Sequence, residues 1–125
     1  MTQETEVQAG RRQLLDWLAE ERQQQQDFLV RFAKIDTANP PGDTREGVRL
    51  IADVLDRQEL TTGLIDPAPD KPNLFAHMDG GRNGGQGGGA QLILNGHVDV
   101  FPVGDLKNWR HDPFGGEIID NKLIG

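Results

Sequence analysis

Residues 92–100 have the sequence LILNGHVDV, which joins an apolar run directly to a histidine and an aspartate. The run is apolar on both faces, as expected for an interior strand covered by helices, and we predict a strand over residues 91–100. Because side chains alternate along a strand, His97 and Asp99 point to the same side. The stretch therefore predicts an imidazole and a carboxylate together at the end of a buried strand.

Such a pair is typical of a metal site, although a purely structural hydrogen bond between His97 and Asp99 is the alternative. Burying these groups without partners is costly. A metal ion would satisfy the imidazole, and a neighbouring carboxylate would orient the ring. Gly96 leaves space for close approach of the backbone. Ligands of open α/β sheets gather at the carboxyl ends of strands, which favours the metal hypothesis.

Composition narrows the function classes. The chain has 125 residues, enough for one modest domain, and a formal net charge of −7. An acidic surface repels phosphate, so we expect neither nucleic acid nor an anionic membrane as partner. The first residues lack the pattern of a signal peptide, and no apolar run reaches transmembrane length, so we expect a cytoplasmic protein.

No serine or cysteine occurs in the chain. A hydrolase built on it would therefore use an activated water as nucleophile, which again favours a metal held by His, Asp or Glu.

The other two histidines are weaker candidates for a metal ligand or catalytic residue. His77 has the same His-x-Asp spacing but follows a short strand, and we expect it on the surface. His111 lies in a loop, where we expect a solvated role.

Apolar spacing predicts two helices near the N-terminus. Residues 1–10 are expected to form a disordered tail, followed by a helix over residues 11–36. The prolines of residues 39–42, NPPG, end this helix. A second, amphipathic helix is predicted over residues 44–59, with Asp43 as its N-cap.

Short strands and turns follow these helices. Besides residues 91–100, we predict strands over residues 61–65, 73–78, 116–119 and 122–124. The last two would form a hairpin, and the glycine-rich residues 80–89 a flexible loop. The order predicts an α/β fold in which helices pack on a mixed central sheet, with residues 11–125 in one domain.

Several of these stretches together resemble the aminoacylase/carboxypeptidase-type zinc metallopeptidases, a family that includes acetylornithine deacetylase, succinyl-diaminopimelate desuccinylase and dipeptidases. The resemblance runs from about residue 29 to residue 125 and excludes the insert 80–89. Its matching stretches are NPPG at 39–42, LILNGHVDVFP at 92–102, Trp109, DPF at 112–114 and residues 115–125.

The resemblance implies a function and roles for two residues. His97 would be a ligand of one of two zinc ions, and Asp99 would fix the imidazole. Family members cleave an amide bond in a peptide or N-acyl amino acid with water held between two metals. Cobalt or manganese can occupy similar nitrogen and oxygen sites. The family's smaller inserted domain, which often forms a homodimer, has no counterpart in this chain.

The remaining family ligands, including a bridging aspartate and a glutamate pair, would follow Gly125. The chain therefore resembles a truncated N-terminal part of the catalytic domain, and we expect the isolated polypeptide to be inactive. The alternative is a non-catalytic α/β domain, or a degenerate relative without a metal role.

Overall fold

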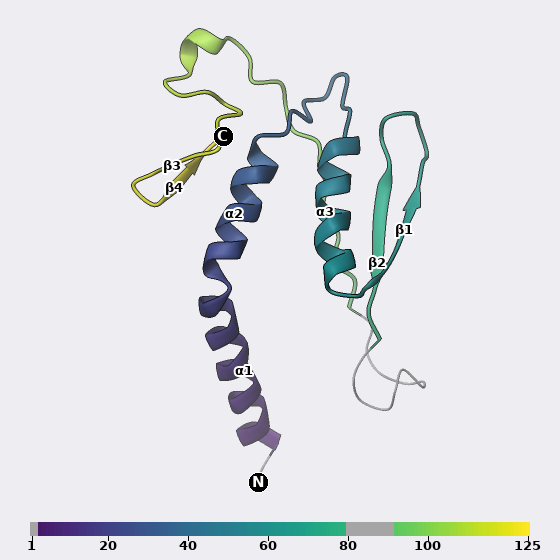
Figure 1. Cartoon of the computed structure of the whole chain (residues 1–125), viewed down its shortest axis with the longest axis vertical. Helices are drawn as coiled ribbons and strands as arrows, with labels where there is room; N and C mark the ends of the chain where they lie inside the picture. The colour runs from purple at the N-terminus through teal and green to yellow at the C-terminus, as the bar shows by residue number, and fades with distance from the viewer. Residues whose placement is uncertain (1–2, 80–91) are drawn as a thin grey trace. The chain divides into compact units, whose positions relative to one another are not determined.

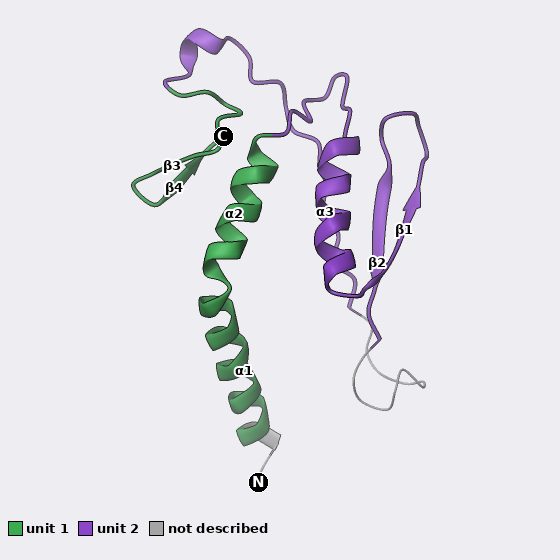
Figure 2. Ribbon diagram, viewed as in Figure 1, with its two compact units in different colours: residues 1–34, 111–125 green, residues 35–110 purple. Residues whose placement is uncertain are grey.

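The computed structural model describes residues 3–79 and 92–125 (Figure 1). The predicted loop at residues 80–89 lies outside the described residues. The chain divides into two compact units, one of residues 1–34 with 111–125 and one of residues 35–110 (Figure 2).

The first unit contains two consecutive helices, α1 (Gln3–Glu20) and α2 (Arg22–Ala33). They replace the single helix predicted over residues 11–36. Residues 3–10, predicted as a disordered tail, belong to α1. Their Gln, Glu and Ala residues have good helix propensity, and no proline interrupts them, so the polar composition alone was a poor guide.

A hairpin completes this unit, formed by β3 (Glu117–Ile119) and β4 (Lys122–Ile124). The strands are antiparallel, with Ile119 opposite Lys122. Asp120 and Asn121 join them with φ angles of 49° and 65°, the left-handed conformation that a two-residue hairpin turn requires. The predicted hairpin is confirmed.

The second unit packs α3 (Arg45–Arg57) on the antiparallel hairpin of β1 (Thr61–Ile65) and β2 (Asn73–His77). Both predicted strands are confirmed, the second to within one residue. Val48, on the predicted apolar face of α3, is buried at 3% exposure, and Leu50, outside that face, is buried at 7%. A short 3₁₀ turn, η2 (Leu106–Asn108), lies in the same unit.

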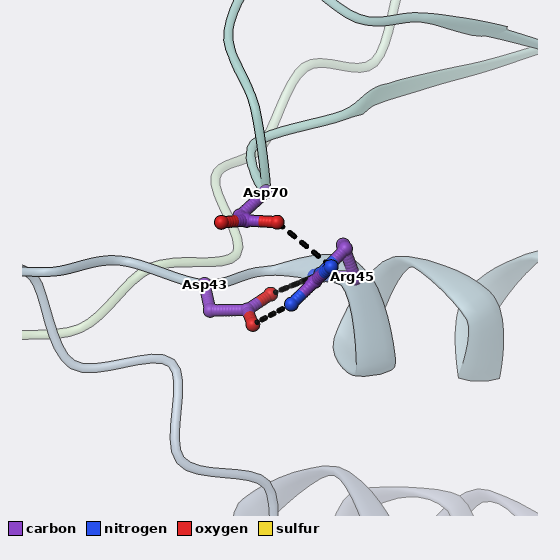
Figure 3. A network of polar contacts seen from close by, with 3 residues as sticks. All are labelled: Asp43, Arg45 and Asp70. Carbon is purple, nitrogen blue, oxygen red and sulfur yellow. Dashed lines mark hydrogen bonds and ion pairs between the residues drawn. The ribbon is translucent and has the colours of Figure 1, made fainter.

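The start of α3 differs from the prediction. The N-cap is Thr44 rather than Asp43, and its side chain makes no capping hydrogen bond. Asp43 instead accepts from the backbone N–H of Arg45 at 3.1 Å and from its guanidinium. The same guanidinium reaches Asp70 at 2.8 Å (Figure 3). Asp43 thus still satisfies a backbone N–H of the first helical turn, and the charged contacts from Arg45 add to that bond.

The strand predicted over residues 91–100 is wrong for the described part of that segment. Residues 92–99 form no strand, and only Val100 makes a bridge, which is parallel, to Ala38. Leu92, Ile93 and Leu94 are 83%, 84% and 86% exposed. The apolar pattern predicts burial, but this segment joins neither of the two sheets of the described residues.

The fold class is confirmed at the level of mixed helices and strands. The single mixed central sheet is not seen among the described residues, which form two separate two-stranded antiparallel sheets. No helix in residues 3–79 or 92–125 is long and apolar enough to cross a membrane.

The Arg45 contacts predict a change in acid behaviour. Hydrogen bonds from Arg45 lower the pKa of Asp43 from 3.8 to about 2. We expect Arg45→Met to raise this pKa towards 3.8, measured by carboxyl ¹³C NMR titration, because the guanidinium bonds are lost. A carboxyl group whose pKa is lower in the folded state stabilises that state at pH values above its unfolded pKa, and this contribution is lost as the pH falls. The difference in stability between the wild type and Arg45→Met should therefore shrink as pH falls from about 4 to about 2.

Arg49→Met is the matched control, one turn further along α3 and without an ion pair in the described structure. It should leave the pKa of Asp43 unchanged. The account of this helix start is wrong if Arg45→Met also leaves that pKa at about 2.

Candidate metal centre

Residues 37–39 and 98–100 lie side by side, although about 60 positions separate them in the sequence. The backbone N–H of Asn39 donates to the Val100 carbonyl at 2.9 Å, and the Val100 N–H donates to the Thr37 carbonyl at 3.3 Å. The Thr37 hydroxyl donates to the Val98 carbonyl at 2.8 Å, and Thr37 is only 3% exposed. These bonds fix the backbone on both sides of Asp99.

The turn after Asn39 depends on a glycine. Gly42 has a φ of +77°, a conformation that favours glycine, and its N–H donates to the Ala38 carbonyl at 2.8 Å. A Cβ at this position would lie 2.8 Å from Asn39 Cγ. Gly42 therefore satisfies the backbone geometry of the turn and also leaves room for the Asn39 side chain.

The imidazole of His97 is held through one nitrogen. Nδ1 lies 2.8 Å from the Asp99 backbone carbonyl and 3.2 Å from Asp99 Oδ1. Both partners are acceptors when the carboxylate is ionised, so Nδ1 carries the proton and Nε2 of the neutral ring carries a lone pair. Nε2 has no hydrogen-bond partner among the described residues, and the side chain is 84% exposed.

The two carboxylate oxygens of Asp99 have different partners. Oδ1 faces His97, and Oδ2 accepts from the Asn39 side-chain amide at 3.0 Å. The Asn39 hydrogen bond lowers the pKa of Asp99, and the smaller effect of His97 acts in the same direction, against a partial desolvation that raises it. The carboxylate is therefore ionised at neutral pH, as an acceptor for an imidazole N–H must be.

This arrangement fits one ligand of a metal site. Zinc binds neutral imidazole nitrogen, and a carboxylate on the opposite ring nitrogen sets the tautomer and the basicity of such a ligand. Within residues 3–79 and 92–125, no group of three His, Cys, Asp or Glu side chains could hold a metal ion. The described structure thus presents a single oriented donor, whereas a zinc site uses three or four protein ligands.

The other two histidines make different contacts. His77, at the end of β2, uses Nε2 to contact Asp79 at 2.9 Å, and both side chains are largely exposed. His111 uses Nδ1 to contact Glu117 of β3 at 3.0 Å, and both are about half exposed. Both histidines lie at the surface, in agreement with the sequence analysis, and neither lies in a cluster of ligands.

Sequence analysis missed two residues of this centre, Asn39 and Thr37. The NPPG stretch at residues 39–42 contains Asn39, but its prolines indicate only a helix stop and not a contact with Asp99. The main-chain carbonyl of Asp99 was also unforeseen, and it is closer to His97 than the carboxylate is.

Comparison with curated proteins gives clear relatives over part of the chain. A succinyl-diaminopimelate desuccinylase of Cereibacter sphaeroides is 52% identical over 54 residues, which are 43% of this chain and 13% of the relative. Succinyl-diaminopimelate desuccinylase 2 of a Ruegeria species is also 52% identical over 54 residues. The enzyme of Methylobacterium nodulans is 44% identical over 57 residues.

Over nearly half of its length, this chain is a relative of the succinyl-diaminopimelate desuccinylases. The predicted family resemblance is thereby confirmed. The matched span covers only about 13% of the length of these relatives. No family model matches the chain, and no solved structure does.

The contacts of His97 and His77 predict opposite tautomers. In alkaline buffer, where both imidazoles are neutral, His97 should carry its proton on Nδ1, because Nδ1 faces the acceptors of Asp99. His77 should carry its proton on Nε2, which faces Asp79. Long-range ¹H–¹⁵N correlation spectra of the metal-free protein distinguish the two forms. An Nε2–H tautomer for His97 would contradict the geometry of the candidate centre.

Proposed function

We propose that the complete protein containing this chain is a metal-dependent amide hydrolase that removes an acyl group from a small N-acyl amino acid or peptide. Two findings support the proposal. The related proteins are named succinyl-diaminopimelate desuccinylases, so a succinyl amide is the first substrate class to test. His97 also presents an open Nε2 while its Nδ1 is held by Asp99, and this observation carries the proposal.

In this proposal, His97 is a ligand of one of two zinc ions, and Asp99 orients its ring. Zinc, when bound, would supply a water of lowered pKa as the nucleophile. Asp99 keeps the proton on Nδ1 and raises the basicity of Nε2 through a charge-assisted hydrogen bond. Cobalt(II) and manganese(II) suit the same nitrogen and oxygen donors. A cytoplasmic location and a homodimer stay predictions.

Substitution of His97 tests the metal role in the complete protein. His97→Ala should lose one zinc ion per subunit and reduce kcat/KM for an N-succinyl amino acid by more than about 100-fold, because a metal ligand is removed. Asp99→Ala should weaken zinc binding by about 10–100-fold, because the backbone carbonyl still holds the ring. Zinc content and steady-state kinetics measure these effects.

His77→Ala is the matched control, since His77 has the same spacing to an aspartate and a similarly exposed ring. It should keep full zinc content and activity. If His97→Ala behaves like His77→Ala, the alternative of a domain without a metal role replaces the proposal.

We further propose that the isolated 125-residue polypeptide is inactive, because its described residues form no set of three metal ligands. An assay on N-succinyl and N-acetyl amino acids with added zinc should show no turnover above that of the His97→Ala polypeptide. Zinc-dependent turnover that His97→Ala removes would contradict this prediction.

A further inference from the structure

We propose that Asn39 is a positioning residue of the candidate centre, which holds the Asp99 carboxylate so that its other oxygen faces His97. This role rests on the proposed function of His97 as a metal ligand. The side-chain amide of Asn39 lies 3.0 Å from Asp99 Oδ2, and Asp99 Oδ1 lies 3.2 Å from His97 Nδ1. Asn39 thus acts on the imidazole through Asp99.

Asn39 is suited to this role because its own backbone is fixed. Its N–H donates to the Val100 carbonyl, directly after Asp99 in the sequence. Gly42 closes the turn that follows and leaves space for the Asn39 side chain. The donor, although exposed, therefore reaches Asp99 from a loop whose backbone is held by hydrogen bonds.

The chemistry of the pair explains why an amide suits this position. An Asn amide donates a hydrogen bond without adding a charge, so it anchors one carboxylate oxygen and leaves the negative charge for the imidazole N–H. Without this anchor, the Asp99 side chain can turn to water. Nδ1 of His97 would then keep only the neutral backbone carbonyl of Asp99, which is a weaker acceptor than a carboxylate.

Two substitutions separate the side-chain contact from the backbone of the loop. Asn39→Ala removes the donor, and Asn39→Asp replaces it with a second carboxylate of similar shape that repels Asp99. Both keep the backbone N–H that contacts Val100. Asn73→Ala, at the exposed start of β2, is the control for loss of an asparagine.

The experiment uses the complete protein loaded with cobalt(II), whose visible spectrum reports on ligand geometry. We expect Asn39→Ala to weaken cobalt binding by up to about tenfold and to shift the spectrum, and Asn39→Asp to have the larger effect. In an Asp99→Ala background, Asn39→Ala should have no further effect, because its partner is gone. Asn73→Ala should match the wild type.

A second measurement needs no metal. In the metal-free protein with labelled histidine, Asn39→Ala should shift the ¹⁵N resonance of His97 Nδ1 and leave that of His77 unchanged. Unchanged cobalt affinity, spectrum and Nδ1 resonance in Asn39→Ala would overturn the positioning role, as would an equal loss with and without Asp99. If His97→Ala itself keeps its cobalt, the proposed function fails and the positioning role fails with it.

Discussion

The parallel bridge between residues 37–39 and 98–100 is the constraint on which the candidate centre depends. It joins two segments about 60 positions apart through two backbone hydrogen bonds and the buried Thr37 hydroxyl. The bridge sets the backbone position of Asp99, the Asn39 amide sets its carboxylate, and Asp99 in turn sets the His97 ring. Together these contacts orient the His97 ring and leave its Nε2 without a partner among the described residues.

Local patterns predicted most of the local structure. Thr61–Ile65 is rich in β-branched residues and lies between turn signals, and Asp120-Asn121 tolerates positive φ, so the two hairpins were visible in the sequence. The predicted start of α3 differs by one residue, with Thr44 as N-cap, while Asp43 still accepts the backbone N–H of Arg45. The sequence did not predict the additional contacts from the Arg45 guanidinium to Asp43 and Asp70, because Asp70 lies 25 positions away.

The segment of residues 92–99 shows the limit of pattern reasoning for the fold. Burying a leucine or isoleucine side chain contributes about 1.5–3 kcal/mol, so the exposure of Leu92, Ile93 and Leu94 is unfavourable in water. An apolar pattern indicates that such residues are suited to burial. It does not identify the strand that would pair with them, and strand pairing is what defines a sheet.

For the candidate centre, the sequence predicted the pair His97 and Asp99 but neither Asn39 nor the contact to the Asp99 carbonyl. The two residues of the pair are close in sequence and meet although residues 92–99 form no strand, whereas the Asn39 contact spans 60 positions. The most direct test of the account is a zinc-edge anomalous difference map of the zinc-loaded complete protein. The account predicts a zinc ion about 2.0–2.1 Å from His97 Nε2, with Nδ1 still on Asp99. Zinc bound only by other residues would contradict it.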